Sequence, residues 1–314
     1  MKRFLGLLIC AFVINSCDDG DVEVKNISFS DIETSASCGE IVYKFNAKEL
    51  LLIKIPESEL AYTNTVGVQT FPISTTNRVI YRNYDGTPTA DNICSNPPAA
   101  TPNVTEEWNG IGGTIEITTT AVKDVNNTTH ATRIIKYNHY IVFKNIVFQK
   151  PNGNQTYDSF VFGDYSTPST LIYPFETSQQ LKKCDTAPLV YNQIGNEALI
   201  ITNIDASLIA NSATPTVRTM PLGTSINVLN YNIYNGPLPL DFFCSGATSP
   251  TLTEPWIADL TLTSGSIEVT TSVVMSGANT QYTHKIHLKN VTLSNGMTNF
   301  YLGDDFYYGD LIVE

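Results

Sequence analysis

Histidine and glutamate side chains that recur in similar sequence settings are the first candidates for chemistry. His139 and His284 each end a Tyr-x-His sequence, and Glu116 and Glu268 each lie between two aliphatic residues. A histidine can act as a general base, and a glycosidase needs two carboxylates about 5–10 Å apart. We interpret all four residues as structural, since polar side chains on Thr-rich strands are expected to form hydrogen bonds within the fold. The alternative for the two histidines is contact with a ligand.

Two tryptophans offer another kind of chemistry, because an exposed indole can carry a sugar ring. Trp108 ends the sequence TEEW and Trp256 ends TEPW. We expect both to fill the core beneath a crossing loop, with a carbohydrate platform as the alternative. The sequence has no G-x-S-x-G elbow, phosphate loop or H-E-x-x-H motif. It therefore predicts no catalytic residue, no metal site and no cofactor.

These recurring residues are part of a longer internal repeat, and the repeat indicates which segments of the chain position them. Matched blocks keep their order with an offset near 148 residues. The blocks are 42–55 with 190–204, 77–86 with 226–236, 105–108 with 253–256, 112–122 with 264–274, 137–148 with 282–293, and 162–165 with 302–305. The repeat predicts one β-domain over 24–165, a linker over 166–180 and a second β-domain over 181–314.

Each copy has the pattern of an all-β domain. Ile115, Ile117 and Thr119 alternate with more polar residues, as expected of a strand with one buried face. Asp85-Gly86 and Asn235-Gly236 follow aromatic-rich segments and favour tight hairpin turns. Short strands separated by turns predict two tandem β-sandwich or jelly-roll-like domains.

Four cysteines lie within the two predicted domains and could pair in three ways. The repeat selects one pairing, because each copy has one cysteine near its start and one after the aromatic hairpin. The predicted disulfides are Cys38–Cys94 and Cys184–Cys244. The alternative, a metal site, lacks the C-x-x-C spacing that such sites usually have.

The first 23 residues indicate where in the cell the protein is expected to be. Two basic residues precede the apolar stretch 4–14, which is too short to cross a hydrocarbon core of about 30 Å as a helix and is typical of a signal peptide. Residues 14–17, Ile-Asn-Ser-Cys, resemble a bacterial lipobox. The resemblance implies cleavage after residue 16 and acylation of Cys17, which would anchor the chain in a membrane lipid layer. The alternative is a plain secretory signal.

An acidic cluster over residues 17–23 follows the lipobox at once. Asp18, Asp19 and Asp21 resemble the surface-export signal of Bacteroidota lipoproteins, particularly flavobacterial ones. The resemblance implies an outer-membrane protein that faces the cell exterior, and it brings no known activity with it. A solvated tether is the alternative reading of the same residues.

The charge of the chain excludes one class of partner. Residues 1–16 contain two basic and no acidic residues, so without them the net charge changes from −12 to −14. Nucleic-acid binding needs Lys and Arg against phosphates, so no nucleic-acid partner is expected. We expect a non-enzymatic surface protein that binds a glycan or an outer-membrane protein. A polysaccharide-acting enzyme and a structural spacer are the alternatives.

Overall fold

A computed structural model describes residues 26–176, 180–212, 214–276 and 279–313. The predicted signal peptide, Cys17 and the acidic cluster lie outside the described residues.

The described chain is nearly all β, as the sequence predicts. The first half contains β1 (Ala36–Cys38), β2 (Ile41–Asn46), β3 (Glu49–Lys54), β4 (Gly67–Pro72), β5 (Arg78–Tyr84), β6 (Val104–Val125), β7 (Thr132–Lys150) and β8 (Gly153–Pro168). The second half contains β9 (Gln180–Lys183), β10 (Leu189–Ile194), β11 (Glu197–Thr202), β12 (Thr216–Pro221), β13 (Val228–Tyr234), β14 (Leu252–Ala258), β15 (Ser266–Ser276), β16 (Asn279–Lys289), β17 (Thr292–Ser294), β18 (Asn299–Tyr301) and β19 (Asp305–Val313). The helices of the described residues are single turns: η1 (Glu57–Glu59) and α1 (Asp91–Cys94) in the first half and α2 (Phe242–Ser245) in the second. No helix among the described residues is long and apolar enough to cross a membrane.

The sheet of the first half folds over on itself at a bend in β6. The first part of β6 pairs with β5, and its second part pairs with β4. The pairing register of β6 with β7 shifts around Gly110 and Gly112, which marks β-bulges. At Gly113 φ is +98°, and a Cβ there would lie 2.5 Å from the Asn145 carbonyl oxygen, so only glycine fits this corner. The bend lets the two ends of one strand serve two layers of a sandwich.

The core of the first half lies between these two layers. Val42, Ile53 and Tyr81 from β2, β3 and β5 are in one buried cluster with Ile117 and Phe143 from β6 and β7. A second cluster lies on the other face of β2, β3 and β5, beside Cys38. Strand β3 is therefore buried on both faces, which explains its unbroken apolar run.

The second half has the same order of strand pairing. The order β9-β10-β11-β13-β14 corresponds to β1-β2-β3-β5-β6, and β12 pairs with β15 as β4 pairs with the second part of β6. The three long strands of the first half are each interrupted in the second half. β14 and β15 together correspond to β6, β16 and β17 to β7, and β18 and β19 to β8. A parallel pair, β9 with β19, joins the two layers.

The predicted disulfides are confirmed in both halves. Cys38 pairs with Cys94, and Cys184 pairs with Cys244, each across one half of the chain. In the first half the bond joins β1 to α1, and in the second half it joins the residue that follows β9 to α2.

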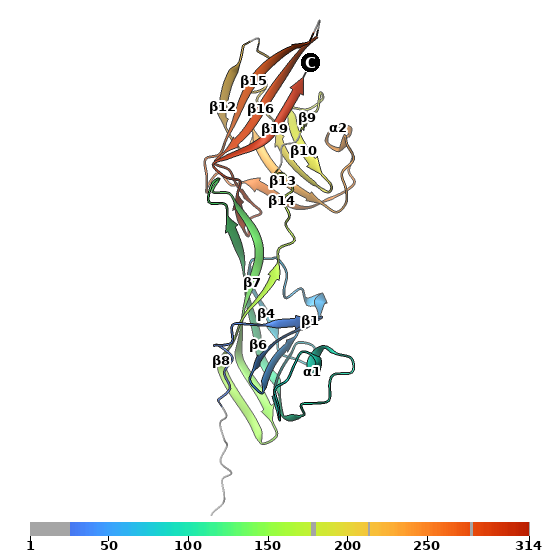
Figure 1. The fold of residues 1–314 in the computed structure, drawn as a ribbon, viewed down its shortest axis with the longest axis vertical. Helices are drawn as coiled ribbons and strands as arrows, with labels where there is room; N and C mark the ends of the chain where they lie inside the picture. The colour runs from blue at the N-terminus through green and yellow to red at the C-terminus, as the bar shows by residue number, and fades with distance from the viewer. Residues whose placement is uncertain (1–25, 177–179, 213, 277–278, 314) are drawn as a thin grey trace, which may run out of the picture.

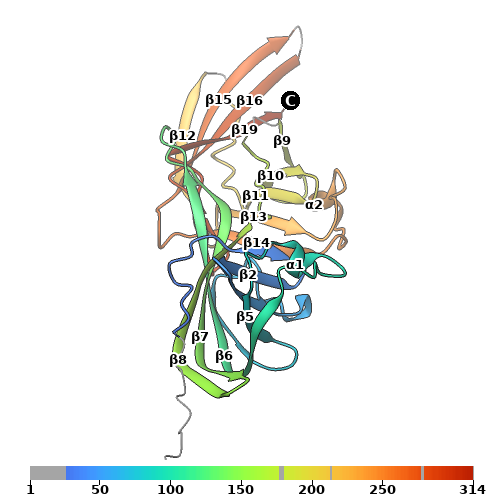
Figure 2. The same cartoon turned by 60° about the horizontal axis from the view of Figure 1, so that its bottom comes forward.

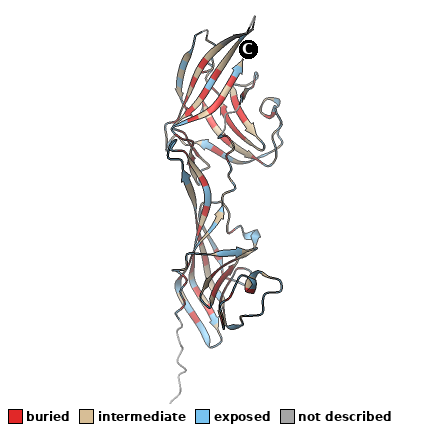
Figure 3. Ribbon diagram, viewed as in Figure 1, coloured by how far each residue is buried: buried red, intermediate tan, exposed pale blue. Residues whose placement is uncertain are grey.

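The two halves lie end to end, which gives the molecule an elongated outline (Figures 1 and 2). Buried positions run along the inner strands of both halves (Figure 3). Tyr173 and Phe175, from the segment predicted as the linker, lie in the core of the second half, while Ile27 and Phe29 lie in the core of the first. The chain thus enters each half through a short aromatic or aliphatic segment, and the exact domain bounds stay a prediction.

Candidate functional site

The two tryptophans are buried and cannot carry a sugar ring. Trp108 and Trp256 are each 0% exposed, and the Trp108 indole N–H donates to Glu106 Oε1 at 2.7 Å. Trp256 packs against Tyr231 and Phe300 in the second core. The ligand-contact alternative for both residues is therefore wrong, because their side chains have no surface to offer.

His139 and His284 are also fully buried, and their rings are held by matching partners. Nδ1 lies 2.9 Å from the hydroxyl oxygen of Thr119 in the first half and of Thr271 in the second. The Nε2 atoms lie 2.9 Å from Thr167 Oγ1 and 3.2 Å from Asn211 Oδ1. Ligand contact at these histidines is ruled out in the same way as at the tryptophans.

Burial sets the charge of these rings. It lowers the pKa of His139 to about 4, because the imidazolium would lose its hydration. It also lowers the pKa of His284, assisted by the positive charges of Arg218 and Lys183. Both imidazoles are therefore neutral near pH 7, which suits hydrogen bonding within the fold.

A matched pair that the sequence reasoning missed is a buried tyrosine with a carboxylate. Tyr81 OH donates to Glu49 Oε1, and Tyr231 OH donates to Glu197 Oε2, both at 2.5 Å. Burial raises the pKa of Glu197, and the Tyr231 hydroxyl opposes that rise. Glu49 and Glu197 lie at matched positions of the blocks 42–55 and 190–204, so a comparison of these blocks could have identified the pair from the sequence.

The acidic residues near the C-terminus do not converge on a metal. Asp304 contacts His130, while Asp305 contacts His287 and Lys289. No group of three or more His, Cys, Asp or Glu side chains within the described ranges could hold a metal ion. Glu116 and Glu268 lie half-buried on β6 and β15, and Glu268 pairs with Lys289 at 3.4 Å.

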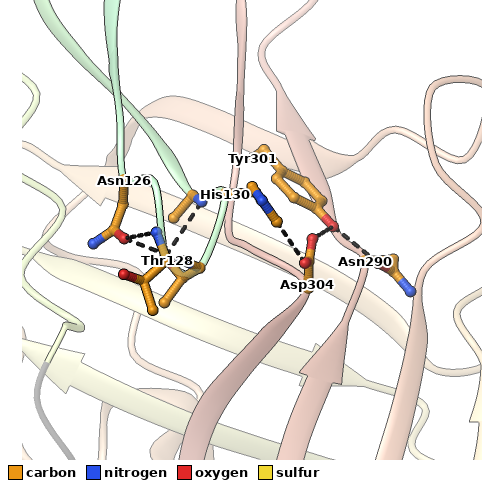
Figure 4. A network of polar contacts seen from close by, with 8 residues as sticks. Asn126, Thr128, His130, Asn290, Tyr301 and Asp304 are labelled. Carbon is orange, nitrogen blue, oxygen red and sulfur yellow. Dashed lines mark hydrogen bonds and ion pairs between the residues drawn. The ribbon is translucent and has the colours of Figure 1, made fainter.

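The polar residues that do converge lie at the junction of the two halves. The β6–β7 hairpin extends from the first half, and its tip docks on the second half (Figures 1 and 4). The backbone N–H of Asp304 donates to the Thr129 carbonyl at 3.0 Å, and that of Tyr301 donates to Thr132 Oγ1 at 2.8 Å. A Cβ on Gly303 would lie 2.9 Å from the Thr129 oxygen, so a glycine there permits the close approach.

A network of side chains surrounds these backbone contacts (Figure 4). His130 Nδ1 lies 2.6 Å from Asp304 Oδ2, and the Tyr301 hydroxyl lies 3.0 Å from Asp304 Oδ1 and 2.9 Å from Asn290 Oδ1. On the hairpin side, Asn126 Oδ1 accepts the backbone N–H groups of Thr128 and Thr129, which shapes the tip. Asp304 accepts both contacts as a carboxylate, and they hold its pKa below the ordinary value.

Arg133 makes several contacts at the junction at once. Its Nε donates to Glu176 Oε1 at 2.5 Å, and its Nη1 donates to the Tyr301 carbonyl at 2.9 Å. The guanidinium lies 4.7 Å from the ring centre of Tyr173 and 5.6 Å from that of Phe300. A planar cation between aromatic rings and a carboxylate combines charge with packing.

The hairpin also contributes apolar side chains to the second core. Ile134 and Tyr137 of β7 belong to the buried cluster of the second half, and Ala121 of β6 packs against it. Ala121 pairs with Tyr137, as Val273 pairs with Tyr282 in the second half. Residues 122–136 separate the first pair, whereas only residues 274–281 separate the second. The first hairpin is therefore longer by the part that docks.

Open cavities lie away from the junction. One of about 730 Å³ lies at the β6 bend and includes Arg78 and Asn109. Another of about 610 Å³ lies beside the second disulfide and includes Lys182 and Leu240. A third, of about 490 Å³, lies on the first half under the segment that precedes β1. All three have volumes within the range of small-ligand sites, roughly 300–1,000 Å³.

No family model, curated protein or solved structure matches this chain.

Proposed function

We propose that this protein is a lipid-anchored cell-surface protein that binds rather than transforms its ligand. Acyl chains on Cys17 would hold the chain on the membrane, and the two β-domains would extend from that anchor. The matched histidine and tryptophan side chains are buried in both halves, which favours a structural role for them over a catalytic one.

The observation that carries the proposal is the junction. A hairpin of the first half supplies Arg133, Ile134 and Tyr137 to the second half, where they are bonded or buried. Such a contact holds two domains in line, whereas domains joined only by a flexible linker usually move relative to one another. A stiff rod on an anchor keeps the second half away from the membrane and exposes both halves to extracellular ligands.

Lipid labelling with surface proteolysis tests the proposal. Cells that make the full chain are grown with an alkyne-tagged fatty acid, and intact cells are then treated with a protease. We expect a labelled protein that the protease removes from intact cells. A chain without label, or a labelled chain that is digested only after lysis, contradicts the anchored surface role.

A further inference from the structure

The face of the second half that receives the hairpin has a counterpart on the first half, and that counterpart is a cavity. The hairpin docks at Gly303 and Asp304. The matched blocks 162–165 and 302–305 place Gly163 and Asp164 at the corresponding positions. Both residues line the cavity of about 490 Å³, and no hairpin covers it among the described residues.

A buried lysine lies at the floor of this cavity. Lys44 of β2 is 2% exposed, and its Nζ donates to the Ile32 carbonyl at 2.5 Å. An ammonium has three protons, and this is the one hydrogen bond of the Lys44 side chain among the residues that the structure describes. Its stem packs in the core with Nζ 5.2 Å from the ring centre of Phe162, and a Cβ on Gly163 would lie 2.8 Å from Nζ. The glycine therefore gives the ammonium access to the cavity.

The other side chains that line the cavity include two carboxylates, one hydroxyl and one tyrosine, beside the aliphatic Ile32 and Val161. Glu33, Asp164 and Ser30 line it together with Tyr140, which is 43% exposed. Asp164 Oδ1 already accepts the amide of Asn138 at 2.7 Å, which fixes the carboxylate. Burial lowers the pKa of Lys44, and the Asp164 carboxylate opposes that change.

These groups select a hydroxyl-rich, uncharged ligand. Two carboxylates and one ammonium give the cavity a net charge of −1 when all are ionised, which repels carboxylates and phosphates. A sugar hydroxyl can accept a hydrogen bond from the ammonium and donate one to a carboxylate at the same time. The exposed face of Tyr140 offers an apolar surface to the ring carbons.

We propose that the cavity of Lys44, Glu33, Asp164 and Tyr140 binds a neutral saccharide. The proposal rests on the binding role proposed above and gives it a site and a ligand class. The second half keeps no such site, because Asn192 replaces Lys44, Lys285 replaces Tyr140 and the hairpin of the first half covers the face. One saccharide should therefore bind per chain.

Binding to neutral oligosaccharides tests the site in the full chain. The probes are an array of neutral glucans, mannans, galactans and xylans, followed by calorimetry with the tightest binder. Lys44→Met keeps the buried stem and removes the ammonium, while Tyr140→Ala and Glu33→Gln change exposed side chains that the fold does not depend on. We expect Lys44→Met and Glu33→Gln to weaken binding by about tenfold or more, because a hydrogen bond to a charged group contributes roughly 1.5–3 kcal/mol and 1.4 kcal/mol is tenfold. Tyr140→Ala should also weaken binding, because it removes the apolar surface that packs on the ring carbons. The control Lys285→Met makes the same chemical change at the counterpart face and should bind like the wild type.

The following outcomes would contradict the proposed saccharide site. Binding that survives Tyr140→Ala and Glu33→Gln places the sugar elsewhere and leaves the surface-binding role standing. An array on which no neutral sugar binds, or on which only anionic sugars bind, rejects the ligand class. The lipid-labelling and proteolysis results are independent of both, so the failure of the site and the failure of the proposed function are distinguishable.

Discussion

At the scale of single residues, the duplicated polar side chains are bonded inside the fold. His139 and Thr119 repeat as His284 and Thr271 at the same distance, and both rings are fully buried. A neutral imidazole there fills space and satisfies two hydrogen-bonding atoms. The same burial makes the fold sensitive to acid, because the imidazolium is more stable in the unfolded chain than in the core.

We expect the first half to lose stability as the pH falls below the ordinary histidine pKa of 6.5. The pKa of His139 is about 4 when folded, so between pH 6.5 and 4 the unfolded chain binds a proton that the folded chain does not. The penalty grows with acidity to at most about 3 kcal/mol at pH 4 and is absent above pH 6.5. Urea denaturation of the wild type and His139→Gln from pH 8 to 4 measures it. An equal decline in His139→Gln and in the wild type would refute the assignment.

Tyr231 should contribute more stability at neutral pH than at acid pH. Tyr231→Phe removes the donor that opposes the raised pKa of Glu197, so the pKa of this carboxyl rises further. A raised carboxyl pKa costs nothing below the unfolded pKa and increasingly destabilises the fold as the pH rises. We expect a loss of about 1–3 kcal/mol at pH 7 and a smaller loss at pH 4, measured by urea denaturation. Tyr282→Phe is the control, since the structure gives its hydroxyl no hydrogen bond among the described residues.

At the scale of elements, the bend of β6 and the docking hairpin decide the architecture. Alternation over residues 115–119 predicts a strand, but not that the same strand runs from Val104 to Val125 through two layers. The bulges depend on Gly113 meeting the Asn145 backbone, which is a contact between residues far apart in the sequence. The run ELLLIK of β3 reads equally as helix or strand, because burial on both faces removes the alternation that distinguishes them.

The corner glycine offers a direct test of the bend. Gly113→Ala places a Cβ 2.5 Å from the Asn145 carbonyl oxygen at a φ of +98°. We expect the first half to lose about 3 kcal/mol or more, since backbone strain and the clash add. Gly153→Ala is the matched control, because its φ is +110° but no atom lies within 4 Å of the added Cβ. It should cost about 1 kcal/mol from the conformation alone. Equal losses in the two variants would show that the corner relaxes.

The junction could not be predicted from the repeat. The matched blocks stop at residue 122 and resume at residue 137, so the docking tip lies in the segment where the copies differ. Arg133, Thr132 and His130 have no matched partners in the second half, and their contacts join residues more than 160 positions apart. The disulfides, in contrast, follow from the repeat because both copies keep their cysteines.

Arg133→Met should loosen the junction and leave both halves folded. The change removes the bond to Glu176 and the charge that faces Tyr173, although a long apolar stem remains. Cation–π contacts contribute roughly 0.5–2 kcal/mol, so hydrogen exchange in residues 169–176 should accelerate by up to about thirtyfold. Small-angle scattering should show a broader range of shapes than in the wild type. Arg82→Met breaks an Arg–Glu pair within the first half, at 2.7 Å from Glu107, and should leave the scattering unchanged. Identical scattering of Arg133→Met and the wild type would contradict a rod held by this residue.

At the scale of the whole molecule, the chain is acidic and elongated. Each half has its own disulfide, and packing contacts join the two halves. Each disulfide closes a loop within one half, so neither constrains the junction. A chain of net charge −14 after residue 16 has no electrostatic attraction to anionic lipids. The membrane attachment that we propose would therefore come from an apolar group, and the acyl chains proposed at Cys17 would supply one.

Substitutions at Cys17 and in the acidic cluster test the proposed lipid anchor and the proposed export signal separately. Cys17→Ser should abolish lipid labelling and release soluble protein, because it removes the site of the acyl chains, each methylene of which contributes about 0.8 kcal/mol when buried. Replacing Asp18, Asp19 and Asp21 with Ala should keep the label but place the protein on the periplasmic side, where proteases outside intact cells do not reach it. With Cys17 acylated as proposed, the acidic cluster would lie directly beside the membrane, where it could not attract anionic lipids, so an export signal would explain its position in the sequence better than a contact with lipid would. If proteases remove the triple variant from intact cells as fast as the wild type, the cluster is only a tether.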